Sequence, residues 1–247
     1  MKIVVIGGTG LIGKKLVGNL QRAGHEVIPA SPNTGVDTLT GKGLAEVLTG
    51  ADIVVDVANS PSFEDSAVMY FFETAGNNIA VAEKAARVKH HVALSVVGTE
   101  KLQDSGYFRA KLVQENIIKA SGIPYTIVRA TQFFEFLTSI AYSATEGETV
   151  RLSSALFQPM SAEDVASILA TITLQQPVNG IVDIAGPQKI SLHDAVAAAL
   201  AANQDNRKMI RDEQAAYFGM MLNDQSLTPQ GSAHFGKQTL QDWLASA

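Results

Sequence analysis

The sequence predicts an α/β fold, namely a Rossmann-type, doubly wound parallel sheet with helices on both faces and a small C-terminal substrate-binding appendage. Three observations lead to this prediction. Short, continuously apolar runs recur in residues 1–130, as in strands that are buried on both faces of a sheet. Segments with helical spacing separate these runs. A glycine-rich turn joins the first run to the first helical segment.

The expected elements of this core follow in a regular order. Strands are expected at residues 2–6, 26–30, 52–57, 91–97 and 125–129. Helices are expected at residues 11–20, 45–48, 66–88 and 107–120. Gly24 and the turn at 121–124 end two of these helices. Because strand–helix–strand crossovers are right-handed, the strands are expected to lie parallel in one doubly wound sheet.

The pattern is less regular after about residue 130. Helices are expected at 132–144, 161–173, 191–201 and 238–245, and a short strand at 181–184. Ser161 and Ser191 are the expected N-caps, and Asp164 stands at the N3 position of a loose capping box. Residues 203–236 match no element. We therefore expect a single domain over 1–247, with about 1–130 as the dinucleotide-binding core and about 131–247 as the appendage.

Composition excludes several classes of protein. The chain has 247 residues, 17% of them charged, and a net charge of −5 with no basic patch, so a nucleic-acid partner is not expected. It has no cysteine, which excludes disulfides, thiol nucleophiles and cysteine metal sites. No apolar run is long enough to span a bilayer or to form a signal peptide. We expect a cytoplasmic enzyme without a membrane partner, and a homo-oligomer is compatible with the sequence.

The turn Gly7-Gly8-Thr9-Gly10-Leu11-Ile12-Gly13 satisfies both G-x-G-x-x-G and G-x-x-G-x-x-G. Its place between a buried strand and a helix is typical of a dinucleotide-binding turn. Glycines there let the backbone approach a pyrophosphate, which the helix N-terminal amides then bind. The alternative is a P-loop over Gly8–Lys15, but Lys15 stands where a Mg²⁺-binding hydroxyl is needed. A tight turn without a ligand is the third interpretation.

The residues after the second strand bear on the choice of dinucleotide. Folds that prefer NAD place an acid there for the ribose 2′-hydroxyl. Here Ala30 is followed by Ser31, Pro32, Asn33 and Thr34, and small hydroxyl and amide groups suit a 2′-phosphate. Lys14 could assist, although no arginine follows the strand. The expected cofactor is therefore NADP(H).

Ser95, Tyr107 and Lys111 form a candidate catalytic set. Ser95 lies near the carboxyl end of the 91–97 strand, and Tyr107 and Lys111, at i and i+4, share one helix face. A nearby ammonium is expected to lower the pKa of the phenol, and a serine hydroxyl can bind a carbonyl oxygen as charge develops. Y-x-x-x-K also arises by chance, and a tyrosine at a helix start is commonly a packing residue.

Several stretches together resemble the short-chain dehydrogenase/reductase superfamily, in its atypical NmrA-like branch. They are the glycine turn, V-D-V-A-N at 55–59, L-S-V-V-G around Ser95, Tyr107-x-x-x-Lys111, and the stretch from Ile123 to Phe134. The resemblance covers the whole chain, more loosely after residue 145. It implies that Ser95, Tyr107 and Lys111 are catalytic, with Lys111 also holding the nicotinamide ribose. It further implies cofactor contacts at Asp37 for adenine, at Ala58, Asn59 and Ser60 for the riboses, and at Ala130 near the nicotinamide.

Two departures from the family pattern bear on function. Ala130 stands where many relatives carry proline after the arginine of that strand. Some NmrA-like members bind NADP but lack the tyrosine and act as regulators, whereas this chain keeps Tyr107 and Lys111. The short appendage makes a bulky nucleotide-sugar substrate less expected.

The expected substrate side is apolar. Phe133 and Phe157 are the candidates for lining a pocket over the nicotinamide, while Phe134 and Phe136 are expected in the core. His90 and His91 point to opposite faces of a strand and cannot chelate one ion, so no metal is expected. The sequence thus predicts an NADPH-dependent reductase of small apolar aldehydes or ketones. The alternatives are an NADP-sensing regulator with a protein partner, or a quinone reductase or epimerase of the same fold.

Overall fold

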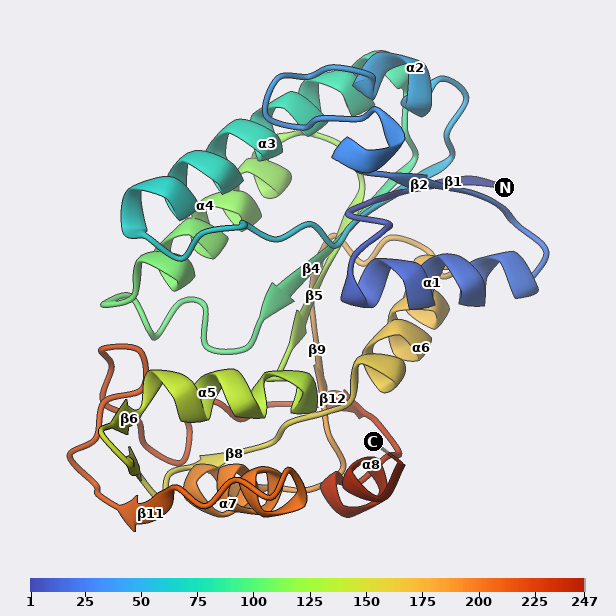
Figure 1. The fold of residues 1–247 in the computed structure, drawn as a ribbon. Helices are drawn as coiled ribbons and strands as arrows, with labels where there is room; N and C mark the ends of the chain where they lie inside the picture. Colours follow the sequence, from blue (N-terminus) through green and yellow to red (C-terminus); the bar gives the residue numbers. More distant parts are fainter. Residues whose placement is uncertain (247) are drawn as a thin grey trace.

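The computed structural model describes residues 1–246, and its centre is a seven-stranded sheet in the order β12-β9-β5-β4-β3-β1-β2. Every neighbouring pair in this sheet is parallel (Figure 1). Its strands are β1 (Lys2–Ile6), β2 (Glu26–Ala30), β3 (Ile53–Asp56), β4 (His90–Val96), β5 (Tyr125–Ala130), β9 (Gly180–Ala185) and β12 (Ala233–Phe235). The predicted fold class is confirmed.

Helices cover both faces of the sheet, because its strands are apolar on both sides. In β1, Ile3 and Val5 pack in the cluster with α1 (Leu11–Arg22) and α6 (Ala162–Thr173). Val4 and Ile6 pack on the opposite face with α2 (Leu44–Leu48) and α3 (Asp65–Ala86), and α4 (Gly106–Ala120) lies beside α3. This alternation explains why the strands are apolar without interruption.

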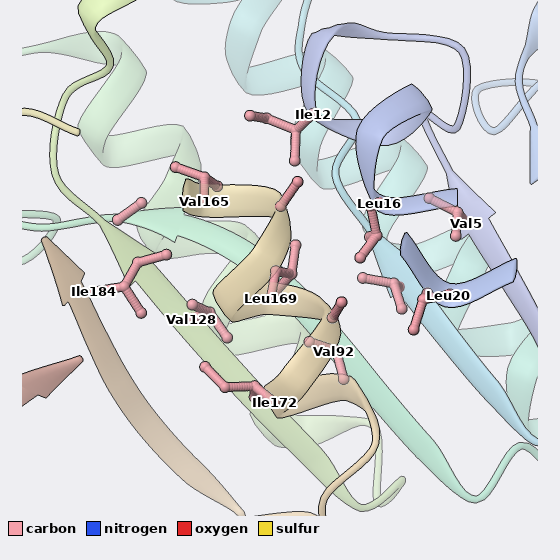
Figure 2. Packing of buried hydrophobic residues seen from close by; sticks show 14 of the residues in the cluster. Val5, Ile12, Leu16, Leu20, Val92, Val128, Val165, Leu169, Ile172 and Ile184 are labelled. Atoms are coloured by element: carbon pink, nitrogen blue, oxygen red, sulfur yellow. The ribbon is translucent and has the colours of Figure 1, made fainter. Parts of the chain in front are cut away.

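Helix α6 comes from the second half of the chain but packs on the core. Figure 2 shows Val165, Leu169 and Ile172 of α6 next to sheet residues Val92, Val128 and Ile184, with Leu16 and Leu20 of α1 alongside. Burial of these side chains contributes roughly 1.5–3 kcal/mol each. The expected Ser161 cap is confirmed, since its hydroxyl accepts from the Asp164 N–H at 3.2 Å. The Asp164 carboxylate instead accepts from the N–H groups of Lys237 and Gln238, both at 2.8 Å.

The expected division at about residue 130 is wrong. Strands β9 and β12 extend the central sheet, and α6 covers it, so residues after 130 complete the core. The appendage, at the bottom of Figure 1, is built from the remaining segments around a second cluster of buried side chains. Its helices are η2 (Phe134–Phe136), α5 (Leu137–Ser143), α7 (Leu192–Ala202) and α8 (Leu240–Ser246). Its strands are β6 (Thr145–Glu146), β7 (Thr149–Leu152), β8 (Leu156–Phe157), β10 (Ile190–Ser191) and β11 (Lys208–Arg211).

The topology brings the carboxyl ends of β2, β1 and β3 together at a switch point of the sheet. Strand order reverses at β1, which lies between β2 and β3. Ligands of open α/β sheets bind outside the carboxyl ends of strands at such a switch point. The segments that leave β1, β2 and β3 there contain the residues that the sequence singles out for a cofactor, except Lys111 on α4 and Ala130 on β5. Among residues 1–246, no helix is both long and apolar enough to cross a bilayer.

Candidate functional site

The glycine turn is so tight that Gly7, Gly8 and Gly13 leave no room for a side chain. A Cβ on Gly7, whose φ is +76°, would lie 2.8 Å from the backbone of Ala58, in the segment after β3. A Cβ on Gly8 would lie 2.6 Å from Cα of Pro29, and one on Gly13 would overlap the carbonyl oxygen of Gly7. Glycines therefore bring β1, α1 and the segment after β3 into close contact.

Gly10 is different, and its surroundings fit a phosphate group. Its Cβ would meet only the Gly7 carbonyl oxygen, at 3.3 Å, and its backbone is extended. The N–H groups of Leu11, Ile12 and Gly13 begin α1 and have no acceptor among residues 1–246. Free amides at a helix N-terminus are an anion-binding arrangement. The turn fits the pyrophosphate of a dinucleotide.

Lys15, which stands at the last position of the alternative P-loop, forms an ion pair with Glu163 at 2.9 Å.

The segment after β2 begins at the same carboxyl edge of the sheet as the glycine turn. Ser31 is buried, and its hydroxyl oxygen has no hydrogen-bond partner within the described chain, as expected for a group that awaits a ligand. The Thr34 hydroxyl donates to the Ser31 carbonyl at 3.0 Å, and Asn33 is exposed. Asp37 caps its own turn by accepting from the Leu39 N–H at 2.8 Å, and this backbone hydrogen bond lowers the pKa of Asp37. No acid occupies the position just after β2.

The segment after β3 connects the glycine turn to Tyr107, the candidate proton donor. Ala58 lies against Gly7, and its N–H donates to the Asp56 carboxylate at 3.0 Å. Asn59 is exposed and accepts from the Tyr107 hydroxyl at 3.3 Å. The Ser60 hydroxyl is buried and accepts from the Ser62 N–H at 3.3 Å. The predicted set of Ala58, Asn59 and Ser60 therefore lies between the glycine turn and Tyr107.

Tyr107 begins α4 and is half-buried among aromatic rings. Phe63, Phe72 and Phe108 lie 5.7, 6.0 and 5.9 Å from it, ring centre to ring centre. Burial raises the pKa of Tyr107 to about 12. The expected lowering by Lys111 does not occur in this structure, since burial dominates the pKa of Tyr107 and the Lys111 ammonium is bound to Leu94 and Gln114 instead.

Lys111 is 3% exposed, and its side chain reaches from α4 to β4. Its ammonium donates to the Leu94 carbonyl at 2.9 Å and to the Gln114 side-chain oxygen, and lies 4.4 Å from the Phe72 ring centre. Burial lowers the pKa of Lys111 to about 8, although the Asp56 and Glu115 carboxylates act in the opposite direction. This amine is therefore close to its titration range at neutral pH.

The Ser95 hydroxyl is hydrogen-bonded within the protein. Its hydroxyl is buried and donates to Glu115 Oε1 at 2.7 Å. Glu115 also receives two bonds from the Arg129 guanidinium, at 2.9 and 2.8 Å, and Arg129 pairs with Glu100. Burial alone would raise the pKa of Glu115, but the hydrogen bonds from Arg129 and Ser95 lower it. In this arrangement the Ser95 proton is not directed toward Tyr107.

The two phenylalanines predicted to contact substrate, Phe133 and Phe157, lie in different environments. Phe157 is 0% exposed in the core of the appendage, so the prediction that it lines an open pocket is wrong. Phe133 is half-buried and stacks on Phe136 at 5.6 Å. Phe134 is in the core as expected, whereas Phe136 is 43% exposed, contrary to expectation. Ala130 is buried at the end of β5.

The two adjacent histidines bind different partners. His90 Nε2 lies 2.9 Å from the Thr126 hydroxyl, and His91 Nδ1 lies 2.6 Å from Glu83. Burial lowers the pKa of His90 to about 4. In the described part of the chain, no three His, Asp or Glu side chains are grouped closely enough to hold a metal ion.

Comparison with known proteins agrees with this geometry. A family model described as NAD(P)H-binding matches residues 7–176, which include the glycine turn, Ser95, Tyr107 and Lys111. The chain belongs to this NAD(P)H-binding family. Its dinucleotide is therefore NAD or NADP, and the free amides after Gly10 together with Ser31 are the groups of this chain that fit it.

Relatives of this NAD(P)H-binding chain have different functions. The photosystem II assembly factor Ycf39 of Cyanophora paradoxa is 25% identical over 230 residues, which cover 85% of this chain and 71% of that protein. A (4-alkanoyl-5-oxo-2,5-dihydrofuran-3-yl)methyl phosphate reductase of Streptomyces griseus is 27% identical over 211 residues, 79% of this chain and 71% of the reductase. These relatives include reductases, which supports an oxidoreductase-type family.

Solved structures share the fold. MoeE5 in complex with UDP-glucuronic acid and NAD superposes with a TM-score of 0.76 at 16% identity, over 99% of this chain and 97% of MoeE5. A dTDP-4-dehydrorhamnose reductase from Bacillus anthracis, in complex with NADP, gives a TM-score of 0.70 at 14% identity, over 90% and 89% of the two chains.

Sequence reasoning missed three residues of the site. Asp56, Gln114 and Glu115 are buried polar groups that bind Ala58, Lys111 and Ser95. Asp56 interrupts the apolar run of β3, and a charged residue within a buried strand was the available signal.

Proposed function

We propose that the chain is an NADPH-dependent reductase of small aldehydes or ketones. The observation that carries this proposal is the contact between the Tyr107 hydroxyl and Asn59 at 3.3 Å, one residue from Ala58, which lies against Gly7 of the cofactor turn. This contact connects a candidate proton donor to the glycine turn that fits the dinucleotide. The bound dinucleotide supplies the hydride.

In this proposal Tyr107 donates its phenolic proton to the carbonyl oxygen as the carbonyl carbon is reduced. The pKa of Tyr107, raised to about 12 by burial, keeps the phenol protonated at neutral pH. Lys111 would bind the nicotinamide ribose and favour the phenolate that forms after transfer, which requires its ammonium to turn from the Leu94 carbonyl and the Gln114 side chain toward Tyr107. Ser95 orients the carbonyl oxygen, which requires its hydroxyl to turn away from Glu115. Ser31, Asn33 and Thr34 receive the 2′-phosphate, while Asp37 and Ser60 lie toward the adenosine.

The proposed substrate is a small carbonyl compound with an apolar body. Phe133 follows the end of β5 by three residues and offers a half-exposed aromatic surface. Phe63 offers another, since it is 69% exposed beside the Tyr107 ring. Aromatic walls with a few polar groups are typical of small-molecule sites.

The test is NADPH oxidation, followed by absorbance, against a panel of aldehydes, ketones and quinones, with NADH in parallel. We expect turnover with NADPH and slower turnover with NADH. Tyr107→Phe keeps the ring packing and removes the proton donor, so it should abolish turnover while NADPH binding stays nearly unchanged. Tyr70→Phe is the matched control, because Tyr70 is 60% exposed on α3. Full activity of Tyr107→Phe would overturn the proposed role, and a clear preference for NADH would overturn the cofactor assignment.

A second candidate is an NADP-sensing regulator that binds a protein partner without turnover. Two observations favour it, namely the bond from Ser95 to Glu115 and the similarity to an assembly factor. It predicts NADPH binding, no turnover on the whole panel, and a stable partner in a pull-down. Turnover that Tyr107→Phe abolishes would exclude it.

A further inference from the structure

Asp56 is a buried carboxylate at the carboxyl end of β3, and each of its oxygens has one defined partner. Asp56 Oδ1 accepts from the Ala58 N–H at 3.0 Å, and Oδ2 accepts from the Gln114 side-chain amide at 2.8 Å. The residue is 4% exposed. A buried carboxylate costs free energy unless it is hydrogen-bonded, so both bonds stabilise the Asp56 side chain in this position.

One of these bonds leads to Tyr107. The hydrogen bond from the Ala58 N–H to Asp56 closes a tight turn. The side-chain oxygen of the next residue, Asn59, accepts a hydrogen bond from the Tyr107 hydroxyl. The turn fixes the backbone from which Asn59 projects. Asp56 therefore acts on Tyr107 through two intervening residues.

The other bond leads to Lys111. Gln114 is 3% exposed and donates its amide to Asp56, so its side-chain oxygen faces the Lys111 ammonium and accepts from it. An amide that donates at one end must accept at the other, so the Asp56 carboxylate determines the orientation of Gln114. The ammonium is held in this way against the Leu94 carbonyl.

Few charged groups surround the hydrogen bonds that join Asp56, Gln114 and Lys111. The Asp56 and Glu115 carboxylates both act to raise the pKa of Lys111. Asp56 and Gln114 also line a small closed space between α3, α4 and the sheet, together with Glu83 and His91, which pair at 2.6 Å. Asp56 is the carboxylate bound through Gln114 to the Lys111 ammonium, whereas Glu115 is bound to Arg129.

We propose that Asp56 is a positioning residue that holds both proton-handling side chains of the site, Tyr107 through Ala58 and Asn59, and Lys111 through Gln114. The catalytic part of this inference rests on the proposed reductase function. Asparagine at this position could not replace aspartate, because it has one accepting oxygen and one donating amide. Asp56→Asn therefore loses either the Ala58 bond or the bond that orients Gln114.

The first experiment needs no turnover. Lysine carrying ¹³C at Cε is incorporated, the Lys111 resonance is assigned with Lys111→Arg, and the resonance is titrated by NMR in the protein without cofactor. Lys111 should titrate near pH 8 in the unmodified chain. In Asp56→Asn its pKa should fall by about 1, because the carboxylate that favours the ammonium is gone. Asp52→Asn, at the start of the same strand segment, carries the same change and should leave Lys111 unchanged, because Asp52 binds Lys89 and the Lys2 N–H.

The second experiment measures kcat and KM across pH for Asp56→Asn and Gln114→Met, with Asp52→Asn as control. Gln114→Met keeps the Asp56–Ala58 bond and the side-chain length, so it tests the network if Asp56→Asn does not fold. We expect kcat to fall about tenfold in both variants, and the alkaline limb of kcat to move to lower pH in Asp56→Asn. A purely structural residue would leave the position of that limb unchanged.

The outcomes distinguish failure of the positioning role of Asp56 from failure of the proposed reductase function. An unchanged Lys111 titration in Asp56→Asn, or an equal change in Asp52→Asn, overturns the role of Asp56 whether or not any substrate is found. Unchanged kcat in Gln114→Met, with turnover present in the unmodified chain, overturns it as well. If the unmodified chain reduces no carbonyl compound while Lys111 still responds to Asp56→Asn, then the reductase function fails and the Asp56 contact to Lys111 is upheld.

Discussion

Gly10→Ala should separate cofactor binding from folding more cleanly than any other change in the glycine turn. Gly10 has φ −80° and ψ −174°, which alanine adopts without strain, and a Cβ there meets only the Gly7 carbonyl oxygen at 3.3 Å. The fold should therefore tolerate the methyl group, with a change in Tm of less than about 2 °C. The same methyl group obstructs the close approach of a pyrophosphate to the turn.

The expected loss follows from the free amides. Leu11, Ile12 and Gly13 offer three N–H groups without acceptors in the described chain. Loss of one hydrogen bond to a charged phosphate costs about 1.5–3 kcal/mol. Since about 1.4 kcal/mol is a factor of ten, Kd for NADPH should rise roughly 10- to 100-fold.

The assay is isothermal titration of NADPH into each variant, with Tm measured on the same samples. Gly18→Ala is the matched control, because its Cβ lies in ordinary contact with Arg22 at 3.5 Å inside α1. It should raise stability by about 1 kcal/mol through helix propensity and leave Kd unchanged. Gly13→Ala should lower Tm, because its Cβ overlaps the Gly7 carbonyl oxygen. If Gly10→Ala binds NADPH as tightly as the unmodified chain, the turn is not the pyrophosphate site.

Three further predictions concern stability. Glu115→Gln should lower the free energy of unfolding by about 3 kcal/mol, because it leaves the buried Arg129 without its bidentate carboxylate; equal urea midpoints would contradict this. Phe218→Asn should raise stability by about 1 kcal/mol, because Phe218 is 55% exposed with φ +48° in a two-residue turn, where asparagine is tolerated; a lower Tm would show that the ring contributes packing. The third concerns His91. Burial alone would lower its pKa, but the Glu83 carboxylate raises it above its usual 6.5. The His91–Glu83 pair therefore adds stability in full below about pH 6.5, and this stability is lost as pH rises through the raised pKa, so Glu83→Gln should flatten the pH dependence measured by urea unfolding.

The core was predictable because its signals are local. Strands β1 and β2 begin and end at the predicted residues, since β-branched runs are bounded by glycine turns and polar residues. The short strands β6, β7, β8, β10 and β11 were missed. Two to four residues give no periodicity, and pairing with distant segments decides their conformation. Contacts of the same long range place β9 and β12 in the central sheet, which local patterns cannot reveal.

The tight glycine turn was predictable, because glycines between a strand and a helix allow a close approach of backbone segments. A tyrosine four residues before a lysine is a less specific pattern, and the catalytic roles of Tyr107 and Lys111 stay predictions. Phe157 was misplaced because an aromatic side chain packs equally well in a core or a pocket, and burial at 0% exposure selects the core. The pKa of Tyr107 was expected to fall because helix spacing places Lys111 on the same face, but spacing does not determine where a long side chain ends. The Lys111 ammonium ends at Leu94 and Gln114.

The contacts of helix α4 explain why Ser95 and Lys111 have these partners. Lys111 and Glu115 are four residues apart on one face of α4, and they meet consecutive residues of β4, namely the Leu94 carbonyl and the Ser95 hydroxyl. Arg129, the neighbour of Ser95 on β5, holds Glu115 from the sheet side. The buried Arg129–Glu115 pair thus fixes the position of α4 against β4, and with it the depth of Lys111. A change at Glu115 should therefore release the Ser95 hydroxyl and shift the Lys111 titration together, whereas a change at Asp56 should shift Lys111 and leave the Ser95–Glu115 bond in place.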